Sequence, residues 1–291
     1  MVKRIRNFFE GLYFMGPSVI VYLACIAVPF VYSLVISTAK WDGLSKTIKW
    51  VGLQNYSKLM KDKAFWSALW FSARSTIAIV IISNILGLLF AVLITSISKP
   101  TGFAQTTILM PNIMSGVILG FIWKFIFNTC LPALGNAFGI DFLQESWLGT
   151  PVSAFWSIVL VSVWQWSGYT MIIYIAGLTQ ISKDLIEASI VDGANPFQTF
   201  FRIKLPLIMP SITICLFWTI SRSIAMFDLP FSLTEGGPFR TTRPVAMDLY
   251  FEAFDKYNYG MGSAKAVVFF ILIFFISMAQ VRSTRRQEVE L

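Results

Sequence analysis

Long apolar segments separated by polar loops are the feature that most restricts the fold of this chain. A hydrocarbon core of about 30 Å is crossed by a helix of about 20 predominantly apolar residues. Hydrophobic residues make up 56% of the 291 positions and charged residues only 13%, which is too apolar for soluble domains. The sequence therefore predicts an all-α polytopic membrane protein, with residues 1–291 forming a single transmembrane domain. Six helices are expected near residues 13–37, 71–97, 106–128, 154–178, 206–228 and 264–282.

Composition also excludes several kinds of chemistry. The chain has no histidine, which removes Ser-His-Asp and Cys-His catalysis and the HExxH zinc site. Its three cysteines, Cys25, Cys130 and Cys215, are far apart and form no CxxC pair, so no metal site is predicted. The net charge is +8, but the basic residues form no cluster separate from the apolar segments, which argues against nucleic-acid binding. We expect no catalytic residues and no metal ligands.

One charged, amphipathic segment lies between the fourth and fifth apolar runs. Ser182 precedes it and can cap a short helix, with Asp184 favourable in the first turn. Gly193 can end that helix in a left-handed conformation. Asn195 and Pro196 can then begin a second helix as its N-cap and first residue. The sequence predicts two short helices joined by a turn and lying along the membrane surface.

The same segment carries a family resemblance. The pattern E-A-[AS]-x-x-D-G-A over Glu187–Ala194, followed by F-x-x-I-x-L-P over Phe200–Pro206, resembles the cytoplasmic coupling loop of ABC importer permeases. It is most similar to the carbohydrate-uptake branch, which includes the membrane subunits of the maltose transporter. Val51–Tyr56 is similar to the GLxNY motif of these permeases, and Phe227–Leu229 with Leu233–Pro238 to their FD…LTxGGP loop. The resemblance extends over most of the chain and implies the type I ABC importer permease fold.

The resemblance implies that residues 179–205 dock into a groove on an ATPase subunit. In relatives the motif glutamate meets a basic residue there, a role that Glu187 takes by position, while Asp192 and Gly193 shape the turn. The alternative is an amphipathic helix that lies on the lipid, which predicts a basic polar face, whereas Asp184, Glu187 and Asp192 are acidic. The residues expected to couple to the ATPase are Glu187, Ala188, Asp192, Gly193, Ala194, Phe197 and Phe201.

Polar residues recur on one face of two spans. Polar groups within a span are costly and usually face a cavity. Both sets follow helical spacing, and counted from Glu187 both fall where the maltose-transporter relatives place sugar contacts. The alternative is helix–helix packing, in which Ser and Thr are common. The residues expected to line the substrate path are Ser162, Gln165, Trp166 and Tyr169 in the fourth span, and Thr219, Arg222, Ser223 and Met226 in the fifth.

Arg222 is unusual within this set. A guanidinium inside a span demands an anion or many acceptors. Three partners remain open: an acidic side chain of a second permease, Asp228 if the helix end unwinds, or a carboxylate on an acidic sugar. Lys124 and Lys265 lie at span ends, where we expect them to extend to the interface.

The chain has no G-x-x-x-x-G-K-[ST] motif and cannot hydrolyse ATP itself. The resemblance implies a permease subunit of an ATP-driven sugar importer, without a cofactor of its own, because ATP and Mg²⁺ bind to partner ATPase subunits. The expected partners are a second homologous permease, two ATPase subunits, an extracellular solute-binding protein, the sugar and the lipid bilayer. The expected location is a bacterial or archaeal plasma membrane, with both termini and residues 179–205 cytoplasmic and residues 39–69 and 229–262 outside.

The sequence alone leaves two other classes of membrane protein to consider. A secondary, ion-coupled transporter would use intramembrane Asp or Glu as an ion relay, yet the middle parts of the predicted spans hold no carboxylate. A membrane enzyme would need titratable groups that converge on one face, and the chain has neither histidine nor a mid-span acid for that purpose.

Overall fold

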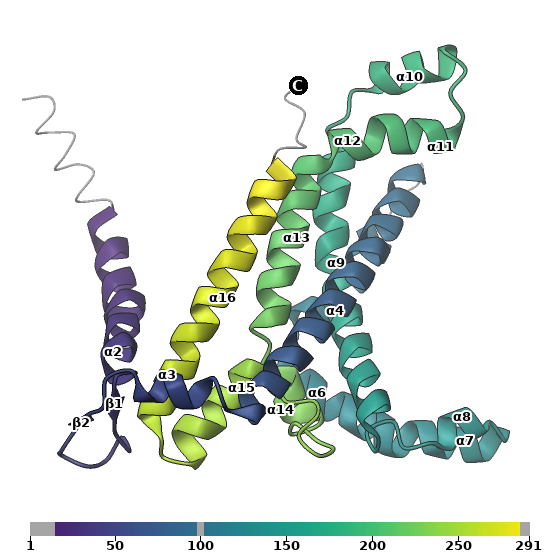
Figure 1. The fold of residues 1–291 in the computed structure, drawn as a ribbon. Helices are drawn as coiled ribbons and strands as arrows, with labels where there is room; N and C mark the ends of the chain where they lie inside the picture. Colours follow the sequence, from purple (N-terminus) through teal and green to yellow (C-terminus); the bar gives the residue numbers. More distant parts are fainter. Residues whose placement is uncertain (1–14, 98–101, 286–291) are drawn as a thin grey trace, which may run out of the picture. The chain divides into compact units, whose positions relative to one another are not determined.

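The computed structural model describes residues 15–97 and 102–285, which are almost wholly helical (Figure 1). The chain divides into two compact units. Both ends of the chain, which we expect in the cytoplasm, lie partly outside the described residues. The first unit comprises Met1–Lys63 and Leu249–Ile271, and the second comprises Ala64–Asp248 and Leu272–Leu291.

The first unit begins with a helix from Met15 to Ile36, which confirms the first predicted span within the described residues. A π-helical turn lies before Pro29, whose ring would otherwise clash with the preceding carbonyls. The other elements are two short antiparallel strands and several helices, of which α16 continues into the second unit. The elements are η1 (Leu23–Ala27), α2 (Val28–Ile36), β1 (Ala39–Lys40), β2 (Lys49–Trp50), α3 (Gln54–Leu59), η4 (Phe251–Asp255) and α16 (Tyr259–Arg285).

The GLxNY motif fixes the turn that follows the first span. The buried Asn55 amide donates hydrogen bonds to the carbonyl oxygens of Ser37 and Ala39, both at 2.8 Å. The Tyr56 hydroxyl forms a 2.6 Å hydrogen bond with the Ser37 hydroxyl. The bond to Ser37 satisfies the carbonyl at the C-cap of α2, and the bond to Ala39 ties α3 to β1, so this motif has a structural role.

An ionic cluster is buried in the first unit. Lys265, whose side chain is 0% exposed, lies 2.8 Å from Asp62 and 3.0 Å from Glu252. Glu252 also accepts hydrogen bonds from Lys256 at 2.8 Å and from the Asn258 amide at 3.0 Å. The expectation that Lys265 extends to the membrane interface was therefore wrong, because two carboxylates hold its ammonium inside the protein.

The second unit contains the remaining helices, and the ends of most of them differ from the ends of the predicted spans. α4 starts eight residues before the predicted second span, and α9 confirms the fourth span to within three residues. The elements are α4 (Lys63–Ser96), α5 (Gly102–Ile113), α6 (Gly116–Phe125), η2 (Ile126–Cys130), α7 (Leu131–Phe138), α8 (Asp141–Gln144), α9 (Pro151–Thr179), α10 (Lys183–Val191), α11 (Pro196–Thr199), η3 (Phe200–Lys204), α12 (Leu205–Leu207), α13 (Met209–Ile224), α14 (Asp228–Leu233) and α15 (Val245–Tyr250).

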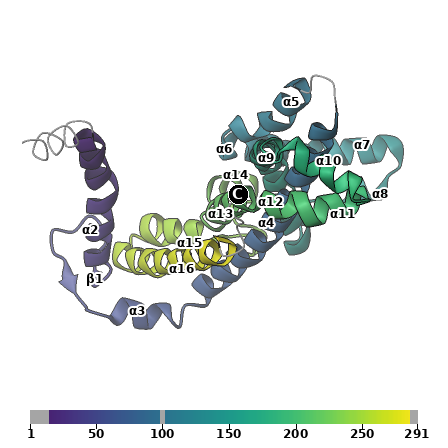
Figure 2. The same cartoon turned by 90° about the horizontal axis from the view of Figure 1, so that it is seen from above.

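The third predicted span, 106–128, is not one continuous helix, and this prediction was wrong. α5 ends at Ile113, and Ser115 adopts an extended conformation before α6 begins. Pro111 contributes to the break because it removes one helical hydrogen bond. The parts on either side of the break have different neighbours: α5 packs against α9, and α6 packs against α14 (Figure 2). α6 continues through η2 and α7 as one apolar helix from Gly116 to Phe138, which is long enough to span the membrane.

The fifth predicted span, 206–228, was too long at both ends. A bend of 68° separates α12 from α13 at Ile208. Pro210 lies in the first turn of α13, where its missing N–H costs nothing, so it begins the helix rather than kinking it. At the other end α13 stops at Ile224, and Asp228 opens a new helix, α14.

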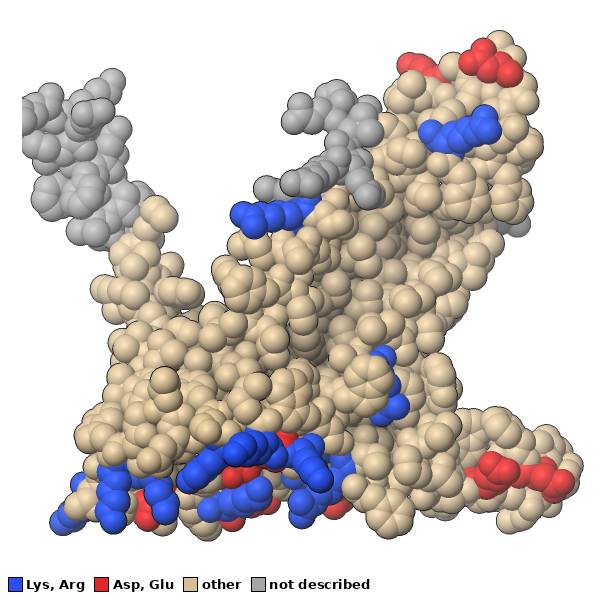
Figure 3. Space-filling view, viewed as in Figure 1, with Lys and Arg blue, Asp and Glu red and all other residues tan. Residues whose placement is uncertain are grey.

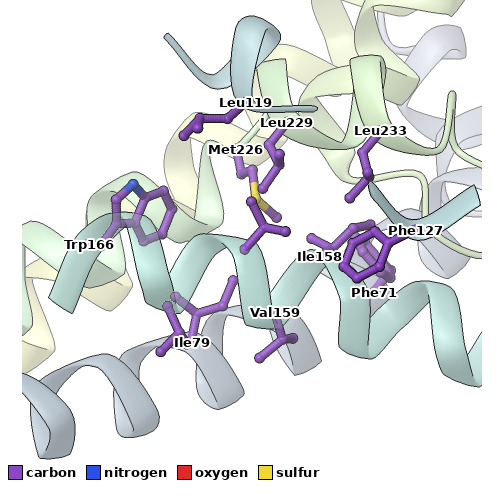
Figure 4. Packing of buried hydrophobic residues seen from close by; sticks show 12 residues of the cluster. Phe71, Ile79, Leu119, Phe127, Ile158, Val159, Trp166, Met226, Leu229 and Leu233 are labelled. Carbon is purple, nitrogen blue, oxygen red and sulfur yellow. The ribbon is translucent and has the colours of Figure 1, made fainter. Parts of the chain in front are cut away.

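Helices long and apolar enough to cross a membrane number five within the described residues, or six if α11–α12 and α13 count as one bent span. In the second unit, buried side chains of α4, α6, α9 and α14 form one continuous core, whose members include Phe71, Leu119, Ile158 and Leu233 (Figure 4). Close backbone contacts tighten this packing. A Cβ at Gly168 of α9 would lie 2.2 Å from the Ile108 carbonyl oxygen of α5.

Candidate functional site: a polar pocket and an exposed loop

A polar pocket of about 480 Å³ lies in the second unit where two helical runs are interrupted. One interruption separates α5 from α6 and the other separates α13 from α14. Broken helices leave backbone groups unpaired, which a span tolerates when they line a cavity or meet a side chain. The Gln165 amide of α9 meets this need by donating to the Met114 carbonyl oxygen at 3.0 Å. The polar side chains of the lining are Asn112, Ser115, Gln165, Ser221, Arg222 and Asp228.

A stack of aromatic rings positions Arg222 at this pocket. Its guanidinium lies over the Trp218 ring, 5.7 Å from the centroid. Trp218 stacks on Tyr169 with centroids 4.1 Å apart, and Trp166 meets Trp218 edge-on at 6.1 Å. Arg222 is exposed and forms no ion pair with Asp228 or with any other described acidic residue. The stack therefore leaves the guanidinium N–H groups available to a ligand in the pocket.

Of the eight residues predicted to line the substrate path, some line the polar pocket and the others contact neighbouring helices. Gln165, Trp166, Arg222 and Met226 line the polar pocket. Met226 lies beyond the end of α13, and its buried sulfur accepts a 3.6 Å hydrogen bond from the Ser162 hydroxyl.

The other members face neighbouring helices. Thr219 is 0% exposed, and its hydroxyl accepts from the Asn84 amide at 3.0 Å and donates to the Cys215 carbonyl at 2.7 Å. Asn84 in turn accepts a 2.7 Å hydrogen bond from the Tyr174 hydroxyl. Ser223 is buried, with no hydrogen-bond partner for its hydroxyl among the described residues. Thr219 thus belongs to a polar network that joins α4, α9 and α13.

Sequence reasoning missed the residue at the centre of the aromatic stack. Trp218 is not among the residues predicted to line the substrate path. It lies four residues before Arg222, and this spacing puts both side chains on one helical face. Ser221 and Asp228 were missed as pocket residues because the end of α13 at Ile224 was not predicted.

The predicted coupling loop forms the two short helices expected, α10 and α11. The Ser182 hydroxyl caps α10 by accepting from the Asp184 N–H at 3.2 Å. Gly193 ends that helix with φ +80°, as predicted. Asn195 caps α11, since its side chain accepts from the Gln198 N–H at 2.8 Å and Gln198 bonds back to Asn195.

The loop presents apolar side chains and an acidic group together. Phe197 is 77% exposed and Phe201 is 55% exposed, with their rings stacked 6.1 Å apart. Glu187 is also exposed. Behind this surface the Ser189 and Thr199 hydroxyls are buried and hydrogen-bonded at 3.2 Å, which ties α10 to α11. Exposed apolar groups of this kind, rimmed by charge, are typical of surfaces that bind another protein.

Spanning helices, a polar pocket at interrupted helices and an exposed amphipathic loop together define a membrane transport subunit. The chain belongs to the family of binding-protein-dependent transport system inner membrane components, whose profile matches residues 83–289. It is therefore a transport protein of the inner membrane rather than an enzyme.

The similar proteins are permeases along their whole length. A probable starch degradation products transport system permease protein, AmyD of Thermoanaerobacterium thermosulfurigenes, is 38% identical and the match covers 100% of both chains. The multiple sugar-binding transport system permease protein MsmF of Streptococcus mutans is 31% identical over 99% of each chain. Among solved structures, a bacterial ABC transporter involved in the import of the acidic polysaccharide alginate matches with a TM-score of 0.84, covering 98% of both chains at 19% identity. This structural match shows the shared fold.

Proposed function

We propose that this chain is the permease subunit of an ATP-driven carbohydrate importer and that its solute passes through the pocket beside Arg222. The observation that carries the proposal is the whole-length similarity to permeases named for starch degradation products and for multiple sugars. The pocket chemistry supports it. Trp166 offers an apolar ring surface to a sugar, and Gln165, Asn112 and Ser221 offer hydrogen-bonding groups to its hydroxyls.

In this proposal the chain works with a second, homologous permease, two ATPase subunits and a solute-binding protein. ATP and Mg²⁺ bind to the ATPase subunits. Residues 179–205 form the coupling loop, in which Phe197 and Phe201 enter a groove on the ATPase and Glu187 meets a basic residue there. Closure of the ATPase dimer draws the two coupling loops together and opens the pocket to the outside.

The proposed orientation places both termini and residues 179–205 in the cytoplasm, and residues 39–69 and 229–262 outside. Single-cysteine labelling of intact cells tests this, in a background without Cys25, Cys130 and Cys215. Val191, which is 86% exposed, is a better reporter for the loop than the buried Ser189. Lys58 reports the outer side. Labelling at position 191 by an impermeant reagent from outside would contradict the orientation.

We further propose that the sugar carries a carboxylate, which Arg222 binds through two parallel hydrogen bonds. The aromatic stack under Arg222 holds the guanidinium with its edge free, and this geometry suits a carboxylate. Asp228 lies in the same pocket, where its carboxylate accepts hydrogen bonds from sugar hydroxyls.

Solute-stimulated ATP hydrolysis by the reconstituted complex tests both proposals. We expect stimulation by oligosaccharides delivered by the binding protein, and a steep loss of transport in Arg222→Gln with normal assembly. Arg74→Gln is the matched control, because Arg74 is also exposed and stacked on aromatic rings, Trp70 and Phe155 at 5.6 and 5.4 Å, but does not line the pocket. A neutral sugar as the best substrate would refute the carboxylate clamp, and stimulation by a solute of another class alone would refute carbohydrate import.

A further inference from the structure

A second polar pocket, of about 490 Å³, lies within the first unit and shares no lining residue with the pocket beside Arg222. Its walls are β1, the loop from β1 to β2, β2 itself and the segment between η4 and α16. In Figure 3, Lys and Arg side chains, with some Asp and Glu among them, cover the surface at the lower left, where Figure 1 labels β1, β2 and α3. Its charged and aromatic lining residues are Lys40, Trp41, Asp42, Lys49, Lys256 and Tyr257.

Two lysines of this pocket lie directly opposite each other. The register of the antiparallel pair β1–β2 aligns Lys40 with Lys49. Residues paired in this way project to the same face, with Cβ atoms about 4.5–5.5 Å apart, and like charges at that spacing oppose strand pairing. Both lysines are exposed and neither forms an ion pair with a described residue. An oxyanion between the two ammonium groups would convert this repulsion into two attractive contacts.

The other charges of the pocket are already engaged. Asp42 Oδ1 accepts from the N–H groups of Ser45 at 2.7 Å and Leu44 at 3.0 Å, and these bonds lower the pKa of Asp42 to about 2. Asp42 therefore stays ionised and fixes the loop, and its charge offsets one lysine. The Lys256 ammonium lies 2.8 Å from Glu252 and belongs to the buried ionic cluster. The excess positive charge comes from the cross-strand lysines.

Aromatic rings stand beside these lysines. The Trp41 indole N–H donates to the Ser45 carbonyl at 2.9 Å, and the Trp41 ring contacts Tyr259 with centroids 5.7 Å apart, so its position is fixed. Tyr257, which is 58% exposed, lines the same pocket. Rings held in place at the wall of a concave pocket bind the apolar face of a sugar at little entropic cost.

We propose that this pocket binds a carboxylate-bearing sugar, with the carboxylate between Lys40 and Lys49 and the sugar ring against Trp41 or Tyr257. The volume falls in the range typical of small-molecule sites, which favours a small ligand over the flat contact of a partner protein. This inference rests on the proposed function and orientation, under which the pocket lies on the outer side and captures an acidic sugar before it reaches Arg222.

The test measures binding of digalacturonate to the complete transporter in nanodiscs by calorimetry, with the uncharged dimethyl ester of the same disaccharide as the comparison. All proteins carry Arg222→Gln, which removes the carboxylate ligand of the other pocket. We expect digalacturonate to bind at least tenfold more tightly than its ester. The pair Lys40→Gln and Lys49→Gln should weaken digalacturonate binding at least tenfold and leave ester binding unchanged. Lys46→Gln is the matched control, because Lys46 lies on the same loop but does not line the pocket.

Four outcomes would overturn the inference. The first is equal affinity for digalacturonate and its ester, and the second is a loss of digalacturonate affinity in Lys46→Gln as large as in the lysine pair. The third is that the lysine pair weakens digalacturonate binding only when the nanodisc contains anionic lipid. The fourth is that the lysine pair weakens only the affinity of the transporter for the binding protein. The last two would assign the lysines to lipid headgroups or to the binding protein. Uptake of sugars is measured in parallel on transporters that retain Arg222, with and without the two lysine substitutions. Sugar uptake without lysine-dependent acid binding refutes this site alone, whereas lysine-dependent acid binding without sugar uptake refutes the proposed function alone.

Discussion

Two lysines that bind the same glutamate oxygen allow the energetic cost of burial to be measured directly. Glu252 Oε2 lies 3.0 Å from the ammonium of Lys265 and 2.8 Å from that of Lys256. The Lys265 side chain is 0% exposed and that of Lys256 is 55% exposed. The two contacts are similar in length, 3.0 and 2.8 Å, so substitution of each lysine by methionine, which keeps most of the side-chain volume, mainly compares a buried with an exposed ammonium.

The expected free energies differ by about an order of magnitude. Lys265→Met leaves Glu252 without its buried cation and Asp62 without the ammonium at 2.8 Å. Removal of one partner of a buried ion pair costs about 3–5 kcal/mol, because the remaining charge stays desolvated. Lys256→Met removes an ammonium that is 55% exposed and lies four residues from Glu252 in the chain, so solvent screening and side-chain entropy limit its contribution to about 0.3–0.5 kcal/mol.

The assay is unfolding of the purified permease by titration with sodium dodecyl sulfate, followed by circular dichroism. We expect a large decrease in the free energy of unfolding for Lys265→Met and almost none for Lys256→Met. A third variant combines Lys265→Met with Asp62→Asn and Glu252→Gln, and it should recover most of the lost stability because no buried charge remains unpaired. Equal destabilisation by the two lysine variants, or no recovery in the triple variant, would refute the reasoning.

Three further predictions follow from other parts of the structure. Burial disfavours ionisation of Glu252, but hydrogen bonds from Lys256 and Lys265 outweigh this effect and lower the pKa of Glu252. The ionised carboxylate therefore stabilises the fold fully above about pH 4.5, and this stabilisation is lost as the pH falls further. The acid unfolding curve of Glu252→Gln should lack the loss of stability caused by protonation of Glu252. Gly168→Ala should destabilise the protein by about 1–3 kcal/mol in the same detergent titration, since its Cβ would meet the Ile108 carbonyl, and an unchanged midpoint would contradict the α5–α9 packing. Glu187→Lys should leave membrane insertion intact but abolish transport and uncouple ATP hydrolysis, and wild-type uptake would disprove the role of Glu187.

Local features of the fold were predictable because their causes lie within a few residues. Ser182, Gly193, Asn195 and Pro196 each act on backbone groups one to three positions away, so the ends of α10 and α11 follow from residue type. The number of apolar segments is likewise a property of composition and length. These features were sufficient to indicate a six-span permease and to place its loop.

Breaks in the spans required the tertiary structure. The segment across Met114 and Ser115 lies between Pro111 and Gly116, but neither residue specifies by itself where the helix stops. The Gln165 amide, fifty-one residues away, compensates the freed Met114 carbonyl. A sequence pattern cannot predict such a bond, because it reports the spacing of side chains but not which helix will be their neighbour.

The sequence by itself determined the class of the protein, the approximate spans and the capped helices α10 and α11, since hydropathy and capping act locally. Tertiary structure alone decided that Thr219 joins a network with Asn84 and Tyr174, and that Trp218 supports Arg222. It also decided that Lys265 is buried between two carboxylates. A polar side chain on the face of a spanning helix is stable in two settings, either lining a cavity or bonded to a side chain of a neighbouring helix. Only the packing of the helices decides which of these two settings each residue occupies.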